Sequence, residues 1–173
     1  MKPEEIKKFL NEAYRKADYE LMFQKAAHDF ELFSTLWSMV KENPSGKTWR
    51  LFWIMDHATE KNNSHLIRIL DELYPFLMQN ETDSYLRMGI KMILRCPINE
   101  EYAGALLDKC IEWINHSKIK VGTRAMAFEF FYSTCKLYPE MAPELLAIID
   151  EQMERSPSAG MKSRMKQIRK NLS

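Results

Sequence analysis

The sequence contains few residues that interrupt helices, with five glycines and seven prolines among 173 residues. Because these two residue types are the main markers of turns, their shortage predicts long helices joined by short links. No stretch shows the sustained alternation of apolar and polar residues that a half-buried strand requires. An apolar run of ~20 residues, the length that a membrane-spanning helix needs, is also missing. We therefore expect an all-α protein without a membrane span.

Cysteine is equally scarce and shows no motif. Cys96, Cys110 and Cys135 lie far apart, are odd in number and include no CxxC pair. This usage favours a reducing compartment in which the thiols act as small apolar residues. The N-terminal segment MKPEEIKKFL begins an amphipathic pattern and lacks the apolar core of a signal peptide. Together these features predict a cytoplasmic location.

Charge of one sign is not in excess, since the net charge is only +1. The chain as a whole therefore lacks the strong field that attracts nucleic acids or membrane surfaces. Basic residues nevertheless gather in residues 157–173, which hold five lysines and arginines and no acid. We interpret this segment as a solvated helix that caps the end of the fold. A surface that contacts anions is the alternative interpretation.

A repeat of 37 residues is the main pattern that the sequence does contain. Arg50, Arg87 and Arg124 recur at this interval, each near the start of an apolar helix. A second helix follows each of them and shares an apolar-apolar-Asp core at residues 69–71, 106–108 and 148–150; the last interval is longer, at 42 residues. Since one such helix pair cannot bury its own apolar face, the units must stack as an α-solenoid.

Several segments resemble a family of short HEAT-like repeat proteins. They are WRLFWIMDHATEK, CIEWI, YPEMAPELLAIID and SAGMKSRMKQIRKNL, and the resemblance covers roughly residues 44–172. Some proteins of that kind bear the label adenylosuccinate lyase. The lyase family carries a Met-Pro-x-Lys-x-Asn signature, and no Met-Pro dipeptide occurs in this sequence. We therefore expect the helical-repeat fold without adenylosuccinate lyase activity.

The predicted architecture is an α-α superhelix, a HEAT/ARM-like solenoid, formed by residues 1–173 as a single domain. Residues 1–43 form an N-terminal helical cap, in which Pro3 starts one helix and Asp18 caps a second. A third helix begins at Phe30 after a weak boundary near His28; the alternative is that the second and third are one long kinked helix. Three helix-pair repeats follow at residues 45–80, 83–118 and 119–156. Residues 157–173 form the basic capping helix.

Aromatic and charged side chains gather in the first repeat and define a candidate binding face. It comprises Trp49, Arg50, Trp53, Asp56, His57, Arg87 and Arg124. Trp49, Trp53 and Asp56 are spaced i, i+4, i+7 along one helix, so Asp56 either is hydrogen-bonded in the core or lies in an aromatic-walled cleft. We predict that Arg87 pairs with Asp56 or another acid of the preceding repeat. Alternatively, the arginine series contacts phosphate or an acidic peptide.

Catalytic, metal and cofactor motifs are not found. Ser45–Thr48 reads SGKT, like the end of a P-loop, but Lys41 occupies the position of its first glycine and the preceding segment is helical. Neither HExxH nor a repeated ExxH occurs, and the four histidines are scattered. We therefore assign no catalytic, cofactor-binding or metal residue.

Two functions fit this pattern. The favoured one is a non-catalytic scaffold that binds a protein or peptide on one face of a curved helical stack. The alternative is a DNA-binding or DNA-alkylation-repair-like protein, because HEAT-like glycosylases combine a solenoid with aromatic residues and one carboxylate. This chain resembles those enzymes only in architecture, and a net charge of +1 gives little electrostatic drive toward DNA.

Overall fold

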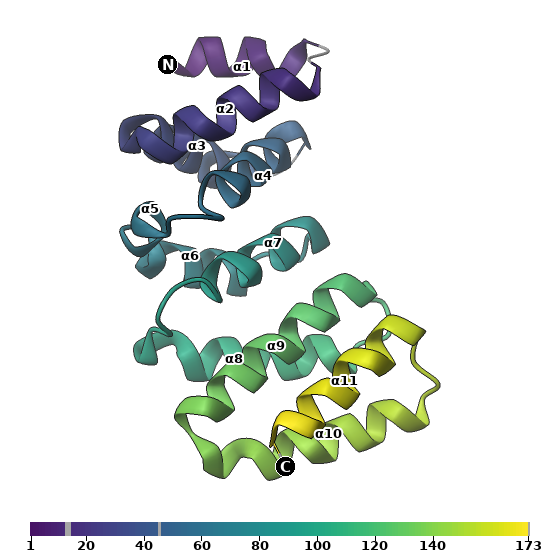
Figure 1. The fold of residues 1–173 in the computed structure, drawn as a ribbon. Coiled ribbons are helices and arrows are strands. Elements are labelled where there is room, and N and C mark those ends of the chain that lie inside the picture. Colours follow the sequence, from purple (N-terminus) through teal and green to yellow (C-terminus); the bar gives the residue numbers. More distant parts are fainter. Residues whose placement is uncertain (13–14, 45, 173) are drawn as a thin grey trace. The chain divides into compact units, whose positions relative to one another are not determined.

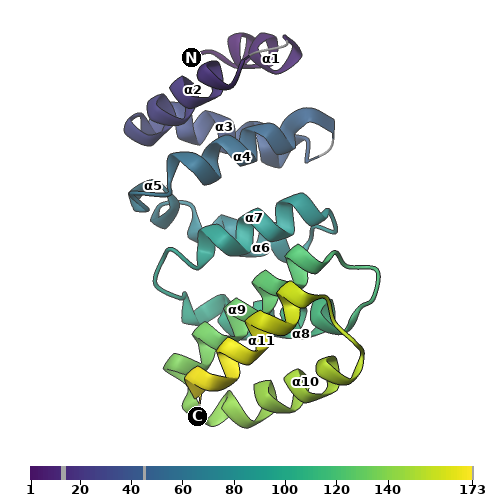
Figure 2. The same cartoon turned by 45° about the vertical axis from the view of Figure 1, so that its right-hand side comes forward.

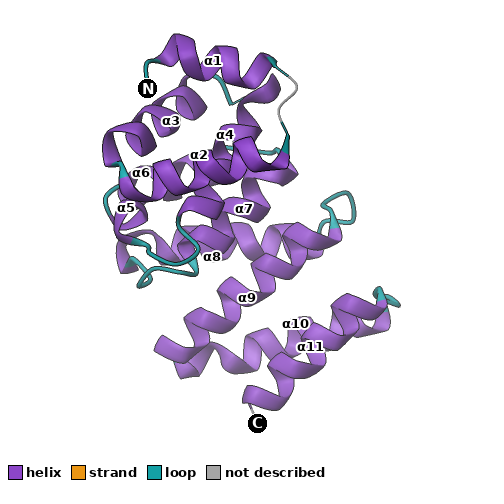
Figure 3. Cartoon of the chain, turned by 45° about the horizontal axis from the view of Figure 1, so that its top comes forward, coloured by secondary structure: helices purple, strands orange, loops and turns teal. Residues whose placement is uncertain are grey.

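A computed structural model describes residues 1–12, 15–44 and 46–172 (Figure 1). Within these ranges every regular element is a helix and no strand occurs (Figure 3), so the all-α prediction is confirmed. Three small parts of the predicted segments lie outside the described residues: residues 13–14 of the cap, residue 45 of the first repeat and residue 173 of the capping helix.

The helices follow the predicted order, and their contacts group them into two compact units, residues 1–96 and 97–173. The first unit holds α1 (Pro3–Asn11), α2 (Lys16–His28), α3 (Phe30–Glu42), the 3₁₀ turn η1 (Gly46–Thr48), α4 (Trp49–Ala58), α5 (Ser64–Ile67), α6 (Leu70–Met78) and α7 (Asp83–Ile93). The second holds α8 (Glu100–Asn115), α9 (Val121–Leu137), the 3₁₀ turn η2 (Pro139–Met141), α10 (Ala142–Glu154) and α11 (Ala159–Leu172). The predicted repeat 83–118 therefore contributes a helix to each unit.

Proline and aspartate residues mark the boundaries of the N-terminal helices. Pro3 opens α1, where its missing N–H costs nothing. Asp29 separates α2 from α3 and caps α3 by accepting a 3.0 Å hydrogen bond from the Leu32 N–H, which explains the boundary near His28. Asp18 does not cap α2 as predicted. It lies inside the first turn and accepts the Arg15 N–H at 2.9 Å, so α2 begins earlier.

In the first unit, α4 packs against α2, α3 and α7. In Figures 1 and 2, α2, α4 and α7 follow one another in one layer, with α3 and α6 behind them. Leu51, Phe52 and Ile54 of α4 are fully buried in this core. The Thr48 and Tyr85 hydroxyl oxygens, 37 residues apart, lie within 2.9 Å of each other. The predicted adjacency of these two equivalent helices is therefore observed.

Helices α6 and α7 approach closely at Gly89. A Cβ atom at this position would lie 2.3 Å from Leu77 Cδ2 and 2.9 Å from Leu77 Cγ. Both residues are buried within the unit. Glycine is therefore required here for space and not for its backbone freedom.

In the second unit, α9 packs against α8, α10 and α11. Three phenylalanines of α9, at 128, 130 and 131, are fully buried. Helix α11 buries Met161, Met165 and Ile168, an i, i+4, i+7 stripe. On its other faces Arg164 pairs with Glu129, and Arg169 pairs with Asp150. The basic helix is thus packed through an apolar stripe, and two of its arginines are neutralised by acids.

Candidate functional site

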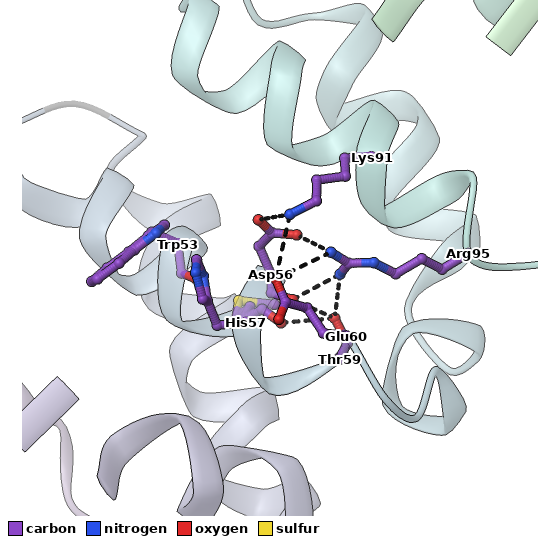
Figure 4. Close-up of polar contacts among 8 residues, drawn as sticks. Trp53, Asp56, His57, Thr59, Glu60, Lys91 and Arg95 are labelled. Carbon is purple, nitrogen blue, oxygen red and sulfur yellow. Dashed lines mark hydrogen bonds and ion pairs between the residues drawn. The ribbon is translucent and has the colours of Figure 1, made fainter. Parts of the chain in front are cut away.

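Asp56 is the only charged residue that is buried within the described residues, with 3% of its surface exposed. It lies near the end of α4 and faces α7 (Figure 4). Lys91 Nζ is 3.1 Å from its Oδ2, and Arg95 Nη2 is 2.7 Å from its Oδ1. Burying a carboxylate costs several kcal/mol unless it is paired, and these two cations supply the compensation.

Arg95 also binds the backbone of α4. Its Nη1 donates to the Asp56 carbonyl oxygen at 2.7 Å and to Thr59 Oγ1 at 3.2 Å. A charged side chain can thus satisfy a carbonyl that has no intrahelical partner at a helix C-terminus. The backbone carbonyl oxygen of Arg95 accepts a 2.6 Å hydrogen bond from Asn63 Nδ2. The end of α4, the following turn and the end of α7 are therefore held together.

Glu60 completes this ion cluster at the surface. Its Oε1 lies 3.5 Å from Lys91 Nζ and 4.0 Å from Arg95 Nη2. The cluster of Asp56, Glu60, Lys91 and Arg95 contains two acids and two cations, so its charges balance. The Asp56 carboxylate is therefore buried and faces two cations, Lys91 of α7 and Arg95 in the turn that follows it.

The predicted pairing of Arg87 with Asp56 is wrong. Arg87 is exposed and forms no ion pair with any described residue. The physical reason is the position of Asp56 along its helix. Asp56 lies six residues after Arg50, and the residue six positions after Arg87, at the same height on the equivalent helix, is Ile93. Lys91 and Arg95 flank that level, whereas Arg87 lies more than one turn before it.

Trp53 and His57 face α2 and form an aromatic cluster there. The Trp53 ring meets Tyr19 and Phe23 edge-on, with centroids 5.3 and 5.0 Å away. The His57 ring stacks on Phe23 with a centroid distance of 4.7 Å, and its Nδ1 donates to the Trp53 carbonyl oxygen at 3.0 Å. Such aromatic pairs stabilise beyond the area they bury, so the cluster fixes both side chains.

The remaining candidate residues do not join this cluster. Trp49 is 40% exposed, and the Arg50 guanidinium lies 5.7 Å from its ring centroid. Arg124 belongs to the second unit, where its Nε donates to the Ile114 carbonyl oxygen at 2.9 Å. The structure thus brings Trp53 and His57 together and directs Asp56 elsewhere. An aromatic-walled cleft around the Asp56 carboxylate is not formed.

A groove of about 410 Å³ lies between α2 and the end of α4, beside the aromatic cluster. It is lined by Glu20, Phe23, Gln24, Ala27, His28, His57, Ala58, Glu60, Lys61 and Asn62. The apolar part consists of the stacked Phe23 and His57 rings with two alanines, and polar side chains form the rim. Only His57 of this set was among the predicted residues. We call this feature the α2–α4 groove.

Groups of potential metal ligands and the cysteine thiols complete the survey of the described residues. No group of three or more His, Cys, Asp or Glu side chains there is arranged to hold a metal ion. The cysteines are buried and free. Burial raises the pKa of Cys110 and, with the charge of Glu144, raises the pKa of Cys135 to about 11, so these thiols are poor nucleophiles at neutral pH.

Comparison with protein families decides the classification. The model of the HEAT repeat domain family matches residues 6–172. The chain is a HEAT repeat protein. The resemblance read from the sequence is therefore confirmed, and it extends further toward the N-terminus than expected, across most of the segment predicted as a cap. No curated protein and no solved structure matches this HEAT repeat protein.

The HEAT repeat protein is a helical scaffold by fold. No helix in its described residues is long and apolar enough to cross a membrane. Repeat scaffolds present extended concave surfaces formed by successive helices, and the α2–α4 groove lies between two neighbouring helices of this fold.

Proposed function

We propose that this HEAT repeat protein is a non-catalytic interaction module that holds a short segment of a partner protein in the α2–α4 groove. The observation that carries the proposal is the composition of the groove. Partly exposed rings of Phe23 and His57 are stacked at 4.7 Å and are surrounded by polar side chains. An apolar floor with a polar rim is the arrangement in which a single anchoring side chain contributes most to binding.

The size of the groove supports a peptide ligand. Its volume of about 410 Å³ accommodates one or two large side chains, because drug-sized ligands occupy pockets of roughly 300–1,000 Å³. Both walls are helices, and a peptide laid along two helices buries its anchors while its backbone stays near solvent. The rim carries both acidic and basic side chains, which offer hydrogen-bond acceptors and donors. This mixture suits the polar backbone of a peptide better than a densely charged polymer such as DNA.

Rigidity is the second requirement, and the ion cluster provides it. Glu60 belongs both to the rim and to the cluster, where Lys91 holds it at 3.5 Å. Trp53 contacts both rings of the floor in T-shaped, edge-on arrangements. Interfaces whose side chains are fixed before binding lose less entropy on association. We therefore assign Asp56, Lys91 and Arg95 a positioning role in this function.

The proposal can be tested by filling the groove. Peptides are selected from a random library on the immobilised chain and then titrated by fluorescence anisotropy. Ala27 is half-buried in the wall of the groove, so Ala27→Trp places an indole in the space that the peptide needs. The matched control is Ala105→Trp, the same exchange at an exposed position of α8.

We expect selected peptides to bind the wild type and Ala105→Trp equally and to lose at least about 10-fold in affinity for Ala27→Trp. Equal binding to both variants would show that the groove is not the site. Duplex DNA in the same assay, at ~100 mM salt, should show no binding up to ~100 µM. This concentration is decisive, because even non-specific DNA-binding proteins bind within that range. Saturable DNA binding would favour the nucleic-acid hypothesis instead.

A further inference from the structure

A second cavity, of about 260 Å³, lies within residues 97–173. It forms where the end of α8, the start of α9 and the loop between α10 and α11 meet. Its polar lining consists of Arg124 and Arg155, the amides of Asn115 and Gln152, and the hydroxyls of Ser117, Ser156 and Ser158. Two cations therefore face the cavity, and no acid is among the described residues that line it.

Hydrogen bonds hold Arg124 in this position. Its Nε donates to the Ile114 carbonyl oxygen at 2.9 Å, and its Nη2 donates to Gln152 Oε1. Gln152 is 1% exposed and in turn donates from Nε2 to Asn115 Oδ1 at 2.9 Å. These bonds use two of the five guanidinium donors. The remaining donors of Arg124 are held in place without a partner among the described residues.

Arg155 binds the same residue, Asn115, at its backbone carbonyl. Its Nη1 donates to the Asn115 carbonyl oxygen at 3.4 Å, and its Nη2 pairs with Glu151. Glu151 lies one turn earlier on α10 and does not line the cavity. Both arginines thus cap the last carbonyls of α8, and both line the same cavity.

Arg155 has a counter-charge in Glu151, whereas Arg124 forms no ion pair with any described residue. Burial and the neighbouring charge of Arg155 lower the pKa of Arg124 below its usual value. Two guanidinium groups near one another therefore repel, and an anion between them would remove the repulsion. The cavity also borders the start of α11, a 14-residue helix whose Met161 N–H donates to Ser158 Oγ at 3.4 Å. Helix N-termini favour negative charge.

We propose that this cavity binds a phosphoryl group, either as free phosphate or on a phosphorylated serine or threonine side chain. The planar guanidinium forks of Arg124 and Arg155 match the oxygens of a tetrahedral anion, and charge-assisted hydrogen bonds of this kind are roughly twice as strong as neutral ones. The serine hydroxyls add further donors. This site lies in the second unit and is independent of the peptide groove proposed for the first.

Inorganic phosphate is the first probe, titrated at constant ionic strength into the full chain and followed by amide chemical shifts. We expect saturable shifts confined to residues near 115–124 and 152–162, with a Kd of about 1–10 mM. Arg155→Gln should weaken binding at least about 10-fold. The control Arg15→Gln removes the same charge at an exposed position of the first unit and should leave the Kd unchanged.

A second pair of variants tests the missing counter-charge of Arg124 without removing a structural arginine. Ser117 is exposed in the turn after α8 and lines the cavity. Ser117→Glu should abolish phosphate binding and raise the Tm by about 2 °C or more, because a carboxylate then faces both arginines. Ser117→Gln, which has the same shape without the charge, should do neither.

A phosphoserine peptide and its unphosphorylated form distinguish the two sources. Binding of the phosphopeptide at least about 10-fold tighter than phosphate would assign the site to a phosphoprotein, and equal binding would assign it to free phosphate. Shifts that grow linearly with phosphate, or that lie outside the cavity, would show an adventitious ion only. Those results, or an unchanged Kd in Arg155→Gln, would overturn the proposal.

Discussion

Removing the partners of Asp56 one at a time should reveal unequal contributions to stability. The three side chains differ in exposure: Asp56 is 4% exposed, Arg95 is 18% exposed and Lys91 is 44% exposed. Because solvent screens exposed ion pairs, Lys91→Met should cost only about 0.5–1 kcal/mol of the free energy of unfolding. Lys91 is therefore expected to be the least important of the three.

Arg95→Met should cost about 3–5 kcal/mol, since it leaves a buried carboxylate with a single, half-exposed cation. The same change deprives the Asp56 carbonyl oxygen of its 2.7 Å hydrogen bond. Asp56→Asn should fall between the two, at about 2–3 kcal/mol, because Lys91 can turn to Glu60 and Arg95 retains its carbonyl partner. The expected order of destabilisation is therefore Arg95→Met, then Asp56→Asn, then Lys91→Met.

Urea unfolding followed by tryptophan fluorescence measures these differences. Three of the four tryptophans, Trp37, Trp49 and Trp53, belong to the first unit, so the signal reports mainly on the unit that contains the cluster. The double variant Asp56→Asn/Arg95→Met should lose at least about 1 kcal/mol less than the sum of its parts, as interacting residues do. An additive double variant, or a Lys91→Met variant as unstable as Arg95→Met, would refute the reasoning.

Three further outcomes are expected. Gly89→Ala should destabilise by about 1–3 kcal/mol in urea, because its new Cβ would lie 2.3 Å from Leu77 Cδ2; an unchanged midpoint would show that α6 can move aside. Stability should be full above pH 6.5 and fall as the pH decreases below it, because burial and the charge of Arg68 lower the pKa of His65 in the folded state; His65→Phe should flatten this part of the pH profile. At pH 8 a thiol reagent should label native Cys135 far more slowly than the urea-unfolded chain, because the pKa of this thiol is raised to about 11.

The sequence predicted the helical-repeat fold because the signals are local and periodic. Proline, asparagine and aspartate at helix ends, and apolar residues every three or four positions, determine where helices start and which faces they bury. The 37-residue interval then predicted that α4 and α7 are equivalent, and the two helices pack together. These signals need no knowledge of distances between remote residues.

The ion cluster was within reach of the sequence, but the wrong residue was chosen. Arg87 attracted the prediction because it repeats the position of Arg50. Asp56 lies deeper in its helix, and adding one repeat leads to Ile93, between Lys91 and Arg95. Equivalent helices in a stack are in register, so the partner of a residue lies near the same depth on the next helix. Applying the interval to Asp56 itself would have found both cations.

The groove could not be predicted, because it depends on α2. Phe23 and Ala27 lie in the N-terminal segment, outside the three repeats that the sequence pattern aligned. The sequence pattern did not align this segment with α4. Their contact with His57 follows from the tertiary packing of α2 against α4, and this packing is a property of complementary side-chain shapes at distant positions.

The two faces of α4 explain why the predicted binding face divides. Trp53 and His57 are separated by 40° around the helix, whereas Asp56 and His57 are separated by about 100°. Because α4 packs between α2 and α7, side chains 100° apart face different neighbours. The carboxylate pairs with Lys91 of α7 and with Arg95 just beyond it, whereas the rings on the α2 side stay partly exposed. The interaction proposed above therefore uses the aromatic side of this helix, and the Asp56 carboxylate links the end of α4 to Lys91 and Arg95.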